Sequence, residues 1–126
     1  MAPVDSVLSL LLVEDHDEMR AALRDWLFTS LPAHKLREAR SMHEALESAG
    51  REKPDLVLMN LELPGANGLE ATRELRRRHP ACPVVVMSRN DAEVLRAAAA
   101  EAGALAFIPK HALPTALLPI LQRVWR

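Results

Sequence analysis

The sequence predicts an α/β domain, a three-layer sandwich in which a parallel five-stranded sheet carries five helices on its two faces. Short apolar runs alternate with amphipathic segments along the chain, and no internal repeat or low-complexity linker interrupts this order. Strands that alternate with helices form a parallel sheet, and right-handed crossovers leave few topologies open. The 126 residues fit one hydrophobic core, so residues 1–126 are expected to form a single domain.

Five segments are predicted as strands. Residues 7–13, the run 56–59 that ends at Asn60, and residues 84–87 are apolar at nearly every position, which is typical of strands covered on both faces. Residues 35–40 alternate only weakly and are interpreted as a short edge strand. Residues 104–108 form a short last strand.

Five segments between these strands have helical spacing of apolar residues and recognisable ends. Ser41 with Glu44 three residues later has the spacing of a capping box, and Asn67 is a second candidate cap. Proline or glycine follows most of the helices and is expected to end them. The predicted helices run from Asp17 to before Pro32, from Ser41 to near Gly50, from Asn67 to before Pro80, from Glu93 to Ala102 with Gly103 as the stop, and from Leu113 through Val124.

The composition excludes several classes of protein. The formal net charge is -1, so no overall field favours nucleic acid or an anionic membrane. Cys82 is the only cysteine, which excludes a disulfide framework and fits a cytoplasmic protein. No signal peptide or membrane span is predicted. The arginine-rich polar face of the third helix is interpreted as a solvated face in preference to an anion-binding patch.

Polar residues follow the predicted strands at the point where each ends. The carboxyl ends of parallel strands meet at one edge of a sheet, where ligands bind. We therefore expect a candidate site at this edge. It is formed by Glu14, Asp15, Asn60, Ser88 and Lys110.

These residues stand in blocks that resemble the receiver domain of bacterial two-component response regulators. The blocks are Leu12-Val13-Glu14-Asp15-His16, residues 54–70, the strand ending at Ser88, and residues 103–110. The sequences of the last block and of the Glu14-Asp15-His16 triplet are most similar to the NarL/LuxR-type branch of this family. Members of that branch usually carry a helix-turn-helix domain, which is not expected in this chain. The resemblance implies a flavodoxin-like sheet of order 2-1-3-4-5.

The resemblance also implies roles for the site residues. A histidine kinase passes a phosphoryl group to an aspartate at the position that is Asn60 here, and an amide is a poor nucleophile, so phosphotransfer is not expected. Magnesium binding is expected to be weak or absent, since one carboxylate is missing. The implied metal ligands are Glu14, Asp15 and the backbone carbonyl of Glu62. The implied phosphoryl-binding groups are Ser88 and Lys110, and the implied aromatic switch is Phe107.

Simpler structural roles stay open for three of these residues: Ser88 as a helix cap, Phe107 as static core and Lys110 as a surface lysine. Arg89 follows Ser88 where most receivers have a small residue, and its guanidinium either covers the pocket or points to solvent. Two further expectations concern charged side chains. Lys110 should pair with Asp15, and the Glu62 side chain should project away from the site.

We expect an atypical receiver that is not an enzyme and acts by protein contact. Its expected partner is another protein or a second copy, bound through the fourth helix, fifth strand and fifth helix. The alternative is a conventional phosphate-accepting receiver of a DNA-binding regulator, with an engineered Asp-to-Asn change at position 60. A flavodoxin-like or phosphohydrolase-like catalyst is disfavoured, because no glycine-rich phosphate loop follows the first strand.

Overall fold

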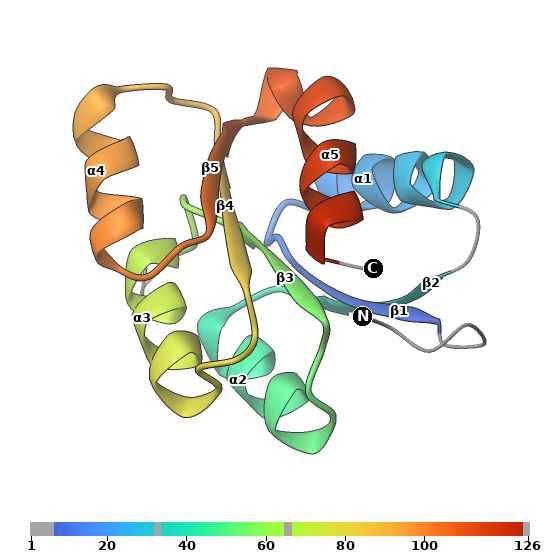
Figure 1. The fold of residues 1–126 in the computed structure, drawn as a ribbon, viewed down its shortest axis with the longest axis horizontal. Coiled ribbons are helices and arrows are strands. Elements are labelled where there is room, and N and C mark those ends of the chain that lie inside the picture. The colour runs from blue at the N-terminus through green and yellow to red at the C-terminus, as the bar shows by residue number, and fades with distance from the viewer. Residues whose placement is uncertain (1–6, 32–33, 65–66, 125–126) are drawn as a thin grey trace.

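The computed structural model describes residues 7–31, 34–64 and 67–124, and it confirms the predicted fold class (Figure 1). The strands are β1 (Leu8–Val13), β2 (His34–Ala39), β3 (Leu56–Asn60), β4 (Val84–Ser88) and β5 (Ala106–Pro109). The helices are α1 (Asp17–Ser30), α2 (Met42–Arg51), α3 (Gly68–Arg78), α4 (Glu93–Glu101) and α5 (Leu113–Val124), with the 3-10 turn η1 (Lys110–Ala112) before α5. Pro32, the predicted stop of the first helix, lies outside the described residues.

The sheet has the order β2-β1-β3-β4-β5, and every neighbouring pair of strands is parallel. The segment interpreted from its weak alternation as an edge strand is β2, which does lie at the edge. All five strands therefore end at the same side of the sheet. This places the residues that follow them within reach of one another.

Two hydrophobic clusters hold the helices on the two faces of the sheet. Because side chains alternate along a strand, Leu11 and Val57 pack on one face with α2, α3 and α4. Leu10 and Leu56 pack on the other face with α1 and α5. Figure 1 shows the same division of the helices. No helix in the described ranges is long and apolar enough to cross a membrane.

Both predicted helix caps are confirmed. The Ser41 hydroxyl accepts a hydrogen bond from the Glu44 N–H at 3.1 Å, and the Asn67 side chain accepts one from the Glu70 N–H at 2.9 Å. The last strand begins two residues later than predicted. Gly103, at a φ of 100°, ends α4, and the Ala104 N–H still bonds to the Ala99 carbonyl, so Ala104 belongs to the helix end.

The start of α3 lies directly against the end of β3, and Gly68 permits this contact. A Cβ atom at Gly68 would lie 2.2 Å from the Asn60 carbonyl oxygen and 2.7 Å from the Leu61 Cα atom. Both neighbours are backbone atoms, so they cannot rotate away. We expect Gly68→Ala to lower the free energy of unfolding by about 1–3 kcal/mol, measured by urea denaturation.

Gly50 provides the matched control for this substitution. It is an exposed residue of α2, and a Cβ atom there would have no neighbour within 4 Å. We expect Gly50→Ala to be neutral or to stabilise the protein by up to about 1 kcal/mol, since alanine favours helix. Equal unfolding free energies for Gly68→Ala and the unchanged protein would contradict the close approach of α3 to β3.

Candidate functional site

The structure brings the predicted strand-end residues together at one edge of the sheet. Glu14 and Asp15 follow β1, Asn60 ends β3, Ser88 ends β4, and Lys110 follows β5. Four of these five side chains are joined to one another by hydrogen bonds, and Ser88 is joined to them through Glu62. A cavity of about 120 Å³ is lined by those four residues and not by Ser88. Its lining also includes Met19 and Arg89, which come from α1 and from the loop after β4.

The centre of the cluster is the Glu14 carboxylate, which is fully buried. One of its oxygens accepts a hydrogen bond from the Lys110 ammonium at 2.9 Å, so the two form a buried ion pair. The other oxygen accepts from the Asn60 amide at 2.9 Å and from the His16 N–H at 3.3 Å. The expectation that Lys110 pairs with Asp15 is therefore wrong. Asp15 is only partly buried and retains water contact, whereas Glu14 has no second counter-charge among the described residues.

The Asn60 side chain is buried and makes hydrogen bonds through both of its polar atoms. Its amide nitrogen donates to Glu14 Oε2 at 2.9 Å and to Asp15 Oδ1 at 3.1 Å, and it lies 3.3 Å from the Glu62 backbone oxygen. Its carbonyl oxygen accepts from the Glu62 N–H at 3.2 Å. The three oxygens expected to bind a metal thus converge on an NH₂ group. Within residues 7–31, 34–64 and 67–124 there is no cluster of three or more His, Cys, Asp or Glu suited to a metal ion.

The Glu62 side chain is part of the site, contrary to the expectation that it projects elsewhere. One carboxylate oxygen accepts a hydrogen bond from the Ser88 hydroxyl at 2.6 Å, and the other accepts from the Arg89 N–H at 3.3 Å. The signal for this placement is the spacing, because Glu62 lies two residues after Asn60. Residues two apart in an extended strand share a face, although β3 itself ends at Asn60 and the chain bends at Leu61.

Ser88 does not cap the helix that follows it. The residue preceding α4 is Ala92, which provides no side-chain cap. The Ser88 hydroxyl instead accepts a hydrogen bond from the Asn90 N–H at 3.0 Å while donating to Glu62. Ser88 therefore ties together two loops, the one after β3 and the one after β4.

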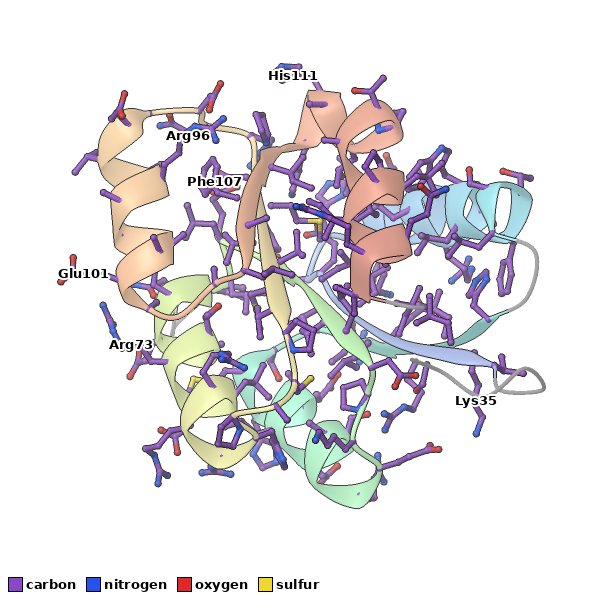
Figure 2. All side chains as sticks on the ribbon, viewed as in Figure 1. Lys35, Arg73, Arg96, Glu101, Phe107 and His111 are labelled. Atoms are coloured by element: carbon purple, nitrogen blue, oxygen red, sulfur yellow. The ribbon has the colours of Figure 1, made fainter. Side chains whose placement is uncertain are left out.

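The Arg89 side chain is exposed, whereas the Phe107 side chain packs against its neighbours. The Arg89 guanidinium is exposed, borders the cavity, and has no ion pair or side-chain hydrogen bond with any described residue. Phe107 is half-buried against the cluster that contains α2, α3 and α4. The Arg96 guanidinium carbon lies 5.0 Å from its ring centroid, and Figure 2 shows the two side chains together between α4 and β5. A change of rotamer at Phe107 stays a prediction.

Other polar or reactive groups lie outside this cluster. The Asp55 carboxylate accepts from the Ser9 N–H at 2.8 Å, at the opposite end of β3. Burial raises the pKa of the Cys82 thiol to about 11, so it is a poor nucleophile at neutral pH. A wider cavity of about 790 Å³ lies on the other side of Glu62, between the loops after β3 and β4, and its lining includes Leu61, Leu69 and Leu95.

Comparison with known proteins agrees with this geometry. The family model of the response regulator receiver domain matches residues 10–122. The transcriptional activator protein ExaE of Pseudomonas putida is 40% identical over 117 residues, which are 93% of this chain and 55% of that protein. The response regulator GacA of Pseudomonas viridiflava is 35% identical over 106 residues, 84% of this chain and 50% of that protein. The chain thus spans about half the length of these curated relatives.

A solved structure shows the same arrangement of the elements. The crystal structure of a two-component response regulator of the LuxR family from Aurantimonas sp. SI85-9A1 matches with a TM-score of 0.86 and 30% sequence identity. The match covers 94% of this chain and 85% of that one. The strand order, the cluster at the carboxyl edge of the sheet and the family match over residues 10–122 lead to one conclusion: the chain belongs to the response regulator receiver domain family.

Proposed function

We propose that this receiver domain works without phosphorylation at residue 60 and signals through contact with proteins. The observation that carries the proposal is the Asn60 amide, which is buried at the end of β3 and donates to Glu14 and Asp15 at 2.9 and 3.1 Å. An amide is uncharged and a poor nucleophile toward phosphorus. Its hydrogen bonds are satisfied within the protein, which favours the observed position over any other.

The same contacts disfavour a tightly held magnesium ion. Glu14, Asp15 and the Glu62 carbonyl provide oxygen, the donor type that Mg²⁺ prefers. These oxygens already surround an NH₂ group, and Glu14 also accepts from Lys110. An ion would have to displace the amide and compete with the ammonium. We therefore infer weak magnesium binding, and no step of the proposed function depends on it.

The relatives extend this proposal to the whole protein. ExaE is named a transcriptional activator and GacA a response regulator, and the aligned residues make up 55% and 50% of their lengths. We propose that the domain regulates transcription as part of a two-component system. We further propose that it meets its partner, a second copy or another protein, through α4, β5 and α5. Val94 of α4 and Leu105 before β5, 73% and 52% exposed, support this surface.

The first prediction concerns phosphorylation by acetyl phosphate in the presence of Mg²⁺. In the Asn60→Asp variant the introduced carboxylate oxygen attacks phosphorus, the bond from phosphorus to the acetyl oxygen breaks, and acetate leaves. We expect intact mass spectrometry to show one added phosphoryl group for Asn60→Asp and none for the unchanged protein.

Asn67 provides a matched control, since it is an asparagine close to the site but caps α3. Asn67→Asp preserves a good cap and adds the same charge, so it should gain no phosphoryl group. A phosphoryl group mapped by peptide sequencing to residue 60 of the unchanged protein would overturn the proposed function.

The second prediction concerns magnesium affinity, measured by isothermal titration calorimetry. Asn60→Asp replaces an NH₂ donor by a carboxylate ligand, so we expect Mg²⁺ to bind at least about tenfold more tightly, which corresponds to about 1.4 kcal/mol. Asn67→Asp should bind like the unchanged protein. Equal affinities for the unchanged protein and Asn60→Asp would contradict the role assigned to the amide.

The third prediction concerns self-association through α4 and β5. Val94→Gln should weaken the dimer at least about tenfold in sedimentation velocity runs at several concentrations, because it removes an exposed apolar contact. Phe28→Gln is the control, since Phe28 is 57% exposed on α1, across the sheet from α4. A protein that stays monomeric at every concentration, or an equal effect of both variants, would argue against a homodimer on this surface.

A further inference from the structure

The Glu62 carboxylate bridges two loops at the edge of the sheet. Glu62 lies in the loop after β3, and both of its hydrogen-bond donors, the Ser88 hydroxyl and the Arg89 N–H, belong to β4 and the loop after it. The residue as a whole is exposed, yet both carboxylate oxygens are held. Glu62 and Arg89 border both of the cavities described above.

The two donors form a cradle suited to an oxyanion. Ser88 is fully buried, and its single hydroxyl hydrogen is directed to Glu62 at 2.6 Å, a distance typical of a hydrogen bond to a charged oxygen. The Arg89 N–H adds a second donor to the same carboxylate. An ionised carboxylate accepts only, so it matches two donors that converge. The cradle is filled by an anion from the chain itself.

Further contacts lead from this cradle to the surface formed by α4 and β5. The Ser88 hydroxyl accepts from the Asn90 N–H at 3.0 Å, and the Asn90 side chain accepts from the Ala92 N–H at 3.0 Å. Ala92 is the residue immediately before α4. Asp91, between them, pairs with Arg96, whose guanidinium lies over the Phe107 ring of β5. The position of the Ser88 hydroxyl is thus coupled to the start of α4.

We propose that Glu62 is the internal anionic ligand of the cradle formed by Ser88 and Arg89, and that this contact fixes the loop leading into α4. The Glu62 latch, meaning the two hydrogen bonds of its carboxylate, excludes a small external oxyanion from the cradle while it is closed. The inference deepens the proposed function and rests on it for the meaning of the α4–β5 surface. The contact itself rests on the geometry alone.

The test compares amide resonances in ¹H–¹⁵N spectra of the unchanged protein and Glu62→Ala. We expect Glu62→Ala to shift the amides of Arg89 and Asn90 and those of Arg96 and Phe107. Added inorganic phosphate should return these resonances toward their original positions with saturation in Glu62→Ala, and should leave the unchanged protein unaffected. Unshifted amides at Arg89 and Asn90 in Glu62→Ala, or an equal phosphate response in both proteins, would overturn the inference.

Two further variants sharpen the comparison. Glu47→Ala removes the same charge from an exposed position on α2 that has no ion pair or hydrogen bond with the described residues, so it should behave like the unchanged protein. Glu62→Gln keeps an acceptor for Ser88 but loses the charge. It should shift the same amides by a smaller amount, and the inference fails if it perturbs them more than Glu62→Ala does.

The rate of phosphorylation by acetyl phosphate distinguishes a failure of this inference from a failure of the proposed function. We expect Asn60→Asp with Glu62→Ala to gain its phosphoryl group at least about tenfold faster than Asn60→Asp alone, because the cradle is open to the incoming oxygens. Equal rates in these two variants would overturn the latch and leave the proposed function intact. Phosphorylation of the unchanged protein at residue 60 would overturn the proposed function, while the amide shifts would still decide the latch.

Discussion

The buried Glu14 carboxylate is the constraint on which the edge of the sheet depends. Removing a carboxylate from water costs several kcal/mol unless a counter-charge and hydrogen bonds replace the water. Here Lys110, Asn60 and the His16 N–H replace it, and they come from the ends of three different strands or the loops that follow them. A buried carboxylate left without its cation costs about 3–5 kcal/mol, a large share of the stability of a small domain. Folding of this edge therefore requires β1, β3 and β5 to meet in register.

Asn60 fits this electrostatic balance better than a third carboxylate would. Two like charges 4 Å apart repel by about 4 kcal/mol at an effective dielectric constant of 20. A carboxylate at residue 60 would face Glu14 and Asp15 with one ammonium, Lys110, to compensate all three, and it would make the cluster bind cations. The amide instead donates hydrogen bonds to both carboxylates. With Asn60, the carboxylates receive hydrogen bonds from within the protein, whereas an aspartate at this position would leave them to be compensated by a cation.

The fold could be predicted from the sequence because its strongest signals are local. The apolar runs of β1, β3 and β4 and the caps at Ser41 and Asn67 each depend on a few neighbouring residues. The start of β5 was less predictable, because the bond from Ala104 to Ala99 depends on how Gly103 turns the chain. Strand ends in a parallel sheet converge for topological reasons, so the five strand-end members of the site could also be predicted.

The pairing within the site could not be predicted in the same way. Whether Lys110 contacts Glu14 or Asp15 depends on which carboxylate is the more buried, and burial follows from the packing of all the surrounding elements. The Glu62 side chain raises the same problem, since its direction depends on the donors that the next loop presents. From the sequence we expected this side chain to project away from the site, and only the structure identified Ser88 and Arg89 as its donors.

Closing the Glu62 latch lowers the free energy only moderately, because the residue is exposed. The closed and the open state are therefore both populated. Two hydrogen bonds to a carboxylate contribute about 1.5–3 kcal/mol together when partly exposed to water, and ordering a glutamate side chain opposes them by about 1–1.5 kcal/mol. A net value near 1 kcal/mol keeps the latch mostly closed with an open fraction of roughly one sixth. A partner that binds the α4–β5 surface more tightly in one of the two states then shifts the ratio of closed to open latch. The size of the shift is set by the difference between its affinities for the two states. Switching by protein contact, as we propose for this domain, thus needs no covalent change at Asn60.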